Sequence, residues 1–418
     1  MAAIVQVRPI TDIPPDRCTS ANPRNAQFYQ NPYPFYAERH ADRDGFFWTD
    51  YGHWCFAGFD QVNRLFRDKR FGREILHRAS RQEIGLPEPK AHTRDFDKAE
   101  LHSLLNLEPP DHTRLRTLVN RAFVSRQVER LRPRIAELAH ELIDGFETHR
   151  EVDLISAFAA PLPAIVIAEL IGVPRDMAPQ LLEWSNRMVR MYMFGVSEET
   201  ERDANAAAIA FIGYLKSLMA DRRRAPQEDL LSHMLANAGT EQTLSDDEIV
   251  STAILLLNAG HEATVHTTGN GVKAILESGL SPARLFADQA QTAATVEECL
   301  RFDAPLHMFT RYALENMELD HGIVLQKGDV IGLLLGAANR DPKRFTAPDA
   351  FDPFRENNQN VSFGAGIHFC IGAPLARIEL QEAMRVLFER LPALSLSEAP
   401  EYADVFHFHG LKRLMVAW

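Results

Sequence analysis

The amino-acid sequence predicts a mainly α-helical fold with minor β sheets, on three observations. Apolar residues recur with helical spacing over 111–235, interrupted only at short breaks that contain Gly and Pro. Two further helices have clear start signals, one at Ser245 and one just after Gly372. Segments 321–335 and 404–418 are typical of strands.

The composition is typical of a soluble globular protein, although the length alone would usually suggest two or three domains. The chain has 418 residues, of which 45% are apolar and 24% are charged, and this suffices to bury a large core. We find no repeat, low-complexity tract or linker, so we expect a single domain over 1–418. The net charge of −12 argues against nucleic acid as a partner. No signal peptide or 18-residue apolar run is visible, which predicts a cytoplasmic protein without a membrane anchor.

The first hundred residues predict short or irregular elements. A Pro-rich arm ends at Tyr36, and aromatic and β-branched residues over 45–58 then predict a short hairpin. Between Phe71 and Pro110 the pattern is mixed, and Gly and Pro residues break it. A loop of this length is most often functional, as a lid or a binding loop.

The helix that begins at Ser245 is predicted to cross the centre of the protein. Ser245 and Glu248 form a capping box. Residues 252–257 are apolar on every side of the helix, which is typical of an interior position. The helix after Gly372 has instead one apolar stripe, made of Leu380, Met384, Leu387 and Leu391.

Residues 363–372 are the most informative segment. Their glycines permit positive φ angles and a close approach of the backbone to a flat ligand. Cys370 comes just before a helix whose N-terminus favours a thiolate. Such a cysteine suits an axial ligand of haem iron, although a lone cysteine is more often an inert core residue. The other cysteines, Cys18, Cys55 and Cys299, are too scattered for disulfides or zinc.

This segment resembles the ligand loop of the cytochrome P450 haem-thiolate monooxygenases of the soluble bacterial type. It matches the loop at every signature position, and residues 375–379 continue the match into the next helix. The resemblance implies one fold around a buried haem b, with Cys370 as the ligand of the iron. It also places around the cofactor the loop residues Phe363, Gly364, Gly366 and Gly372.

Glu298 and Arg301 are spaced to share one face of a helix and to pair. Alone, such a pair is usually a solvated surface ion pair. Here its separation from Cys370 suits the buried Glu–Arg pair of the family, and Arg355 supplies the second arginine. The resemblance implies that these three residues hold the cysteine loop in shape.

A second companion motif contains His112 and Arg116, which are four residues apart and point the same way. Haem carries two propionates that need cationic or hydrogen-bonding partners. The resemblance places these two residues around the propionates together with Arg311 and His368. By the sequence alone, each of the four would more often be a surface charge.

Residues 259–264 of the central helix are similar to the oxygen groove of the family. Gly260 in a helix costs about 1 kcal/mol relative to Ala, so we expect a close approach that compensates. The resemblance implies that dioxygen is received here and that Glu262 feeds protons towards it. Burial in an apolar helix predicts a raised pKa for Glu262. The alternative is a helix-end acid that reaches solvent.

Residue 263 departs from the family, because it is Ala where Thr is usual. Thr264 follows, but it is rotated by about 100° on a helix. The standard hydroxyl-assisted protonation is therefore in doubt. We hypothesise that a bound water or a hydroxyl of the substrate replaces the missing group at Ala263.

The resemblance implies that O2 is split and that one oxygen atom enters a small hydrophobic or aromatic organic substrate. The chain has no flavin or iron–sulfur motif, so we expect a ferredoxin and an NAD(P)H-dependent ferredoxin reductase as partners of a monomer. A basic face around Arg114 and Arg121 suits an acidic ferredoxin. No Arg occurs between Ser251 and Gly279, which disfavours direct use of peroxide.

Two other classes of protein stay open. One is a haem-thiolate isomerase or dehydratase, which Glu262 disfavours and Ala263 slightly favours. The other is a haem-based sensor or carrier, which needs no acid in the groove and often brings a signalling domain.

The expected substrate pocket draws on the long loop before residue 105, on 177–200 and on the central helix. Asn258 interrupts a run of leucines and is expected either to face a polar group of the substrate or to bond a neighbouring helix. Further polar candidates are His307 and His409. The remaining pocket residues implied by the resemblance are Ala259, Leu306, Met308, Phe309, His407 and Phe408.

Overall fold

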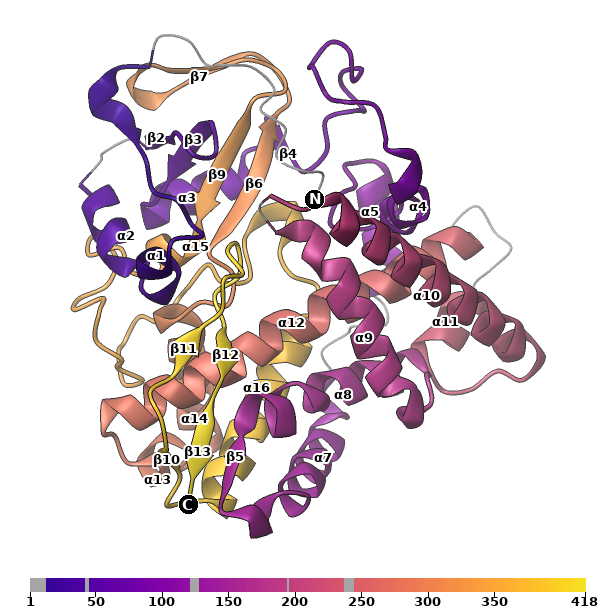
Figure 1. Ribbon diagram of the computed structural model, residues 1–418, viewed down its shortest axis with the longest axis vertical. Coiled ribbons are helices and arrows are strands. Elements are labelled where there is room, and N and C mark those ends of the chain that lie inside the picture. The colour runs from indigo at the N-terminus through magenta and orange to yellow at the C-terminus, as the bar shows by residue number, and fades with distance from the viewer. Residues whose placement is uncertain (1–12, 42–44, 121–127, 194, 237–243) are drawn as a thin grey trace.

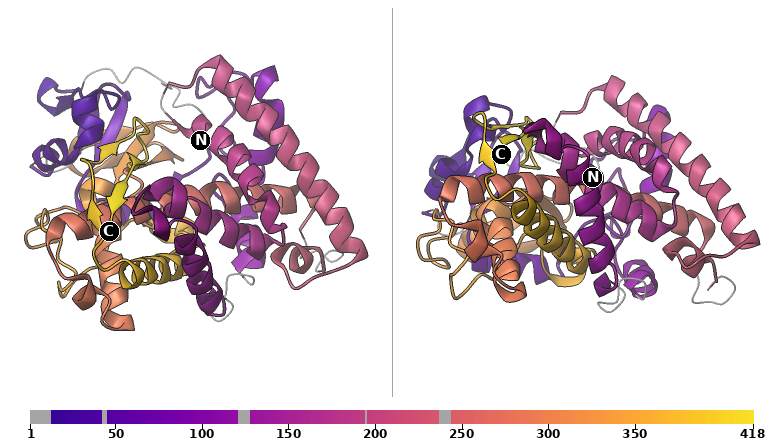
Figure 2. Two further views of the ribbon diagram at one scale, coloured as in Figure 1. Left: turned by 60° about the horizontal axis from the view of Figure 1, so that its bottom comes forward. Right: turned by 90° about the horizontal axis from the view of Figure 1, so that it is seen from below.

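The computed structural model describes residues 13–41, 45–120, 128–193, 195–236 and 244–418. Helix α12 (Asp246–Ser278) crosses the middle of the molecule, with most of the β structure on one side and helices on the other (Figures 1 and 2). The other helices are α1 (Ala26–Gln30), α2 (Tyr33–Arg39), α3 (Phe59–Arg67), α4 (Arg94–Glu100), α5 (Asp111–Asn120), α7 (Arg132–Asp144), α8 (Pro161–Ile171), α9 (Ala178–Val189), α10 (Glu198–Arg224), α11 (Leu230–Ala236), α13 (Pro282–Leu285), α14 (Gln289–Phe302), α15 (Leu335–Ala338) and α16 (Ala373–Arg390).

The largest sheet among the described residues has six strands in the order β1-β2-β3-β9-β6-β4. They are β1 (Cys18–Thr19), β2 (Phe46–Trp48), β3 (His53–Phe56), β9 (Val330–Leu334), β6 (Met308–Ala313) and β4 (Phe71–Gly72). Strands β2 and β3 form the predicted hairpin, whereas β3 and β9 pair in parallel. The smaller sheets contain β10 (Ser395–Leu396), β13 (Met415–Ala417) and β5 (Glu151–Asp153), then β11 (Glu401–Tyr402) with β12 (Leu411–Arg413), and β7 (Met317–Leu319) with β8 (Ile323–Leu325).

The buried apolar residues divide into a helical core and several smaller clusters on the sheet side. The helical core is built from α7 to α12, α14 and α16. The sheet-side clusters join the six-stranded sheet to α2, α3 and α15. Helix α12 therefore has protein on nearly every side, as its uniformly apolar segment predicts.

Several predicted elements are confirmed. Ser245 accepts from the backbone of Glu248, whose side chain accepts from the backbone of Ser245, so the capping box at the start of α12 is complete. Helix α16 begins directly after Gly372. Segment 321–335 contains β8 and β9, and 404–418 contains β12 and β13.

The long segment after β4 is mostly irregular, but it also contains α4. None of the helices within the described residues is both long and apolar enough to cross a membrane.

Candidate active site

The cysteine loop takes its shape from two glycines with left-handed backbone. Gly364 has φ 68° and Gly366 has φ 73°, and side chains rarely adopt such angles. A Cβ atom on Gly366 would lie 2.4 Å from the backbone oxygen of Phe66 in α3. The loop closes on itself where the Cys370 N–H donates to the Phe363 carbonyl at 3.0 Å. Gly366 therefore requires glycine for both angle and space, and Gly364 requires it for its angle.

The thiol of Cys370 is exposed, although protein surrounds the residue closely enough to raise its pKa by desolvation. The backbone N–H groups of Gly372 and Ala373 and the charge of Arg116 act in the opposite direction. The N–H groups at the start of α16 thus favour a thiolate, as expected, but desolvation outweighs them and leaves the pKa of the Cys370 thiol raised.

A buried ion pair on α14 supports this loop. Glu298 and Arg301 are both fully buried, and two N–H groups of Arg301 donate to the two carboxylate oxygens at 2.7 Å each. The Nε atom of Arg355 lies 3.3 Å from Glu298, so all three predicted residues meet. Ser362 ties the loop to the same helix by donating to the Leu300 carbonyl at 2.7 Å. We call residues 363–372 with Glu298, Arg301 and Arg355 the thiolate side.

Four residues were predicted to hold the propionates. Of these, His112 contacts His368, Arg116 contacts the cysteine loop, and Arg311 is buried on β6. The rings of His112 and His368 are 4.4 Å apart between centroids, and His112 Nε2 is buried with no hydrogen-bond partner. Arg116 donates to the Phe369 carbonyl at 2.5 Å, next to Cys370. Arg311 is buried on β6, and burial, reinforced by the charge of Arg73, lowers its pKa.

Sequence reasoning missed two residues of this cluster, Arg73 and Glu108. The Arg73 guanidinium is buried and donates to the Thr310 carbonyl at 2.8 Å, while Glu108 accepts from the Arg73 backbone at 2.5 Å and lies 3.2 Å from His368. Burial lowers the pKa of Arg73 to about 10. Nothing in the sequence distinguishes Arg73 from a surface arginine.

The donor set fits an anionic cofactor. Two buried guanidinium groups, those of Arg73 and Arg311, face one carboxylate, that of Glu108. The unpartnered nitrogen of His112 belongs to α5, whose His112 ring contacts His368, and the exposed Cys370 lies two residues after His368 on the cysteine loop. Haem, with two propionates and an iron that accepts a thiolate, matches this chemistry.

We call residues 258–266 of α12 the oxygen side, because the otherwise buried helix is partly exposed within this stretch. The residues before it are buried, Ala259 is exposed, and Ala263 on the same face is half-buried. A Cβ on Gly260 would lie 2.5 Å from Ile167 of α8, so the predicted close approach is confirmed. The hydroxyl of Thr264 donates to the Gly260 carbonyl at 2.9 Å and is thus engaged by the helix itself.

The structure corrects the expected pKa of Glu262. Burial alone would raise the pKa of this carboxyl, but the His266 hydrogen bond and the charges of His266 and His261 lower it to about 2. The His266 Nε2 atom lies 3.1 Å from one carboxylate oxygen, and His261 Nε2 lies 3.4 Å from the other. Glu262 is therefore held as a carboxylate. The sequence did contain a signal for this lowered pKa, because His266 lies four residues after Glu262 and therefore on the same face of the helix.

Some expected pocket residues lie in other surroundings. Met308 is fully buried in the sheet-side cluster that contains Phe28 and Tyr36, so its prediction as a pocket residue is wrong. Alternation along β6 turns Met308 and Phe309 to opposite faces. Asn258 is buried and reaches α9, with its Nδ2 atom 3.9 Å from the Met188 sulfur.

Two expected pocket residues are neighbours, because Leu306 and Phe408 form an isolated antiparallel bridge. His407 is buried, and desolvation lowers its pKa to about 3, so its imidazole is neutral. Of the predicted basic face, Arg114 pairs with Glu248, and Arg121 lies outside the described residues.

Comparison with known proteins identifies the class of fold and site. The family model for cytochrome P450 matches residues 73–277 and 290–399, and the chain belongs to this family. Members of the family are haem-thiolate enzymes, and several relatives of this chain are named as monooxygenases or hydroxylases.

The biotin biosynthesis cytochrome P450 of Bacillus subtilis is 36% identical over 398 residues, which are 94% of this chain and 98% of that protein. The monooxygenase PikC of Streptomyces venezuelae is 36% identical and aligns over 94% of this chain and 92% of its own. The crystal structure of P450BioI with a fatty-acid-ligated acyl carrier protein has a TM-score of 0.87 at 35% identity, covering 94% of this chain and 100% of that chain.

Proposed function

We propose that this protein inserts one oxygen atom from O2 into a small hydrophobic or aromatic organic substrate that carries at least one oxygen. The observation that carries the proposal is the exposed Cys370 thiol on a loop fixed by two left-handed glycines and a buried Glu298–Arg301 pair. When bound, haem supplies the activation of O2 that a thiolate ligand promotes. The residues of the chain bind the cofactor, exclude water and transfer protons.

In this proposal each cluster has one task. Cys370 provides the thiolate ligand, within the loop shaped by Phe363, Gly364, Gly366 and Gly372. The propionates are held by His112, Arg116, Arg311 and His368, together with Arg73, which the structure adds to the predicted set.

On the oxygen side, the exposed Ala259 and the half-buried Ala263 form the open face of α12, and Glu262 is the acid adjacent to Ala263. The Thr264 hydroxyl does not substitute for a hydroxyl at 263, because it is bonded to the helix backbone. Asn258, Ala259, Leu306, Phe309, His407 and Phe408 are the residues proposed to line the substrate pocket.

We further propose electrons from a ferredoxin and its NAD(P)H-dependent reductase, and a single-domain, monomeric, cytoplasmic protein. The sequence contains no flavin or iron–sulfur motif, and this supports electron supply by separate proteins. Helix α12 packs against helices from both the N-terminal and the C-terminal parts of the chain, α8 and α16 among them, and this supports one domain.

Three measurements test the proposal. Carbon monoxide binding to the reduced protein should give the red-shifted absorption band of a thiolate-ligated haem, and its absence in folded, haem-loaded protein would refute Cys370 as the ligand. A screen of hydrophobic and aromatic oxygen-containing compounds, read by the spin-state shift of the haem, should yield binders. With ferredoxin, reductase and such a binder, NADH consumption should produce an oxygenated product. Conversion without NADH would indicate an isomerase or dehydratase instead.

A further inference from the structure

Helix α12 carries a row of polar side chains on one buried face. Glu262, His266 and Asn270 are spaced four residues apart and therefore share that face. The Asn270 side chain donates to the carbonyl oxygens of Asp303 and His409 at 3.3 and 2.9 Å. A polar row inside a helix that is otherwise apolar has to be satisfied by specific partners.

The imidazole of His266 is fixed between this row and the segment before β12. A Cβ on Gly410 would lie 1.8 Å from His266 Nδ1, so only glycine leaves room for the ring. The Phe408 ring lies 5.8 Å from it between centroids. His266 is itself buried, and its Nε2 atom lies 3.1 Å from a carboxylate oxygen of Glu262.

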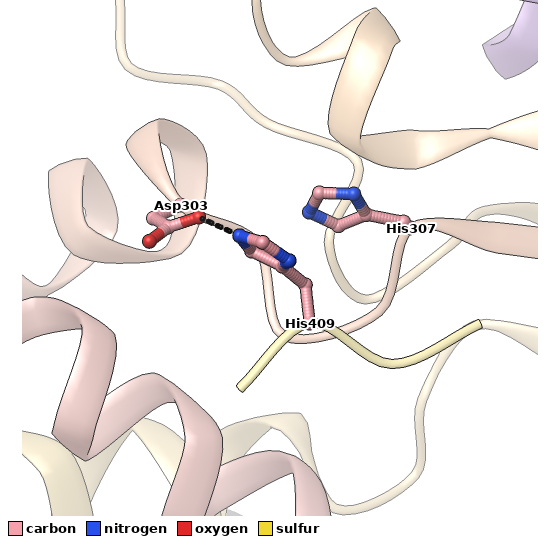
Figure 3. A group of neighbouring side chains, drawn as sticks. All are labelled: Asp303, His307 and His409. Atoms are coloured by element: carbon pink, nitrogen blue, oxygen red, sulfur yellow. Dashed lines mark ion pairs between the residues drawn. The ribbon is translucent and has the colours of Figure 1, made fainter. Parts of the chain in front are cut away.

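The next ionisable groups form the cluster of Asp303, His307 and His409 (Figure 3). Three such ligands suit a cation, and His409 Nε2 lies 3.4 Å from the Asp303 carboxylate. Both Asp303 oxygens, however, accept from tyrosines, Tyr33 and Tyr402.

The guanidinium of Arg340 lies 3.6 Å from the Tyr33 ring centroid, and its charge also lowers the pKa of the two histidines, which burial lowers most. This positive charge disfavours a bound cation. We therefore interpret the cluster as a hydrogen-bonded network, and its His409 is the ionisable side chain that faces His266 from the C-terminal segment.

His261 is the other imidazole beside Glu262. Its Nε2 atom is farther from the carboxylate, at 3.4 Å, and Ser185 Oγ lies 3.5 Å from its Nδ1. Burial lowers the pKa of His261. His266 is thus the better placed of the two to bring a proton to Glu262.

We propose that His266 is the proton-supplying partner of Glu262 and does the work of the hydroxyl that residue 263 lacks. In this scheme solvent protonates His266, and the proton passes from its Nε2 atom to the Oε1 atom of Glu262, which lies 3.1 Å away. Glu262 releases it towards the reduction of O2, and the electrons come from the ferredoxin. The inference rests on the proposed monooxygenase function, and it makes His266 a positioning residue.

The first test reads the carboxyl of Glu262 directly, without turnover, in the infrared spectrum of the ferric, haem-loaded protein at about pH 5. We expect no protonated carboxyl band from Glu262 in the unmodified protein. His266→Leu should produce one, and the added substitution Glu262→Gln should remove it. Thr268→Val, a buried change one turn along α12, is the matched control and should produce none. A His266→Leu spectrum like that of the control would refute the proposed interaction between His266 and the Glu262 carboxylate.

The second test measures proton supply with ferredoxin, reductase, NADH and O2 but no organic substrate. Two electrons and two protons convert O2 to peroxide, whereas four of each convert it to two waters. His266→Gln keeps a donor for Glu262 but cannot carry a proton, so the rate of water formation should fall about tenfold or more. Water formation at the wild-type rate would refute the role of His266, and this variant decides the matter should His266→Leu not fold.

Failure of the proposed function itself would look different. The wild-type protein would then lack the carbon monoxide band or would convert its substrate without NADH, whereas failure of the His266 inference leaves both wild-type results as expected.

Discussion

The thiolate side and the oxygen side are stabilised by different kinds of interaction. The thiolate side depends on left-handed backbone at Gly364 and Gly366 and on an ion pair with no exposed surface. The oxygen side depends on side chains that share the carboxylate of Glu262. Changes to the first should therefore alter folding and cofactor retention, and changes to the second should mainly alter proton chemistry.

The largest effect is expected from Arg301→Ala. It removes both Arg301 hydrogen bonds from the buried Glu298, which keeps only Arg355 as a cationic neighbour, and it deprives three backbone carbonyls of a donor, so the free energy of unfolding should fall by about 3–5 kcal/mol. Chemical denaturation and haem content measure this. The control is Arg202→Ala, which removes an exposed pair with Glu198 on α10 and should change stability by less than about 1 kcal/mol. Equal losses of unfolding free energy in the two variants would contradict a stabilising role of the buried Glu298–Arg301 pair.

Gly366→Ala should follow, with a loss of about 2–4 kcal/mol, because its Cβ would press on the backbone oxygen of Phe66 in addition to the strain of a positive φ. Gly279→Ala has nearly the same φ, 69°, but no atom within 4 Å, so it should lose only about 1 kcal/mol. The difference between their unfolding free energies measures the close approach of the loop to α3. No difference would mean that the angle alone matters.

On the oxygen side, Glu262→Gln should lower stability in a pH-dependent manner. The pKa of Glu262 is about 2 in the folded protein against an ordinary 4.5, so the ionised carboxylate stabilises the fold above pH 4.5. That contribution, about 3 kcal/mol at neutral pH, is lost as the pH falls from about 4.5 to about 2. Urea titrations of both proteins across this range should converge at the acid end. A constant difference would show that packing, rather than charge, is lost.

The smallest change in stability, under about 1 kcal/mol, is expected for Ala263→Thr, because the site is half-buried. If His266 already supplies protons, the added hydroxyl should lower peroxide leakage per product by no more than about threefold. The ratio of peroxide to oxygenated product is the measurement. A ratio that does not move with any substrate would exclude residue 263 from the relay.

Features determined by near neighbours in the chain were predictable from the sequence. The capping box at Ser245 and the Glu298–Arg301 contact each span three residues, so a helix places their side chains together without further information. The left-handed loop was predictable for the same reason, because glycine is the residue that tolerates such angles.

Features that depend on distant segments were not predictable. Arg73 meets Thr310 only because β4 pairs with β6. The resemblance implied a pocket position for Met308, and nothing local in the sequence shows which face of β6 meets α2. For Glu262, burial was foreseen, but the orientation of two imidazoles decides the direction of its pKa shift.

The parallel pairing of β3 with β9 bears on how the chain folds. It joins residues 54–56 to 331–333, so the sheet closes only after almost the entire intervening helical region has been synthesised and brought together. Contacts of such long sequence separation form slowly compared with local helices. The cysteine loop follows β9 and rests on Phe66 of α3, and it should therefore reach its final position late. Haem capture is then a late event in maturation, and it reports on completion of the sheet rather than on collapse of the helices.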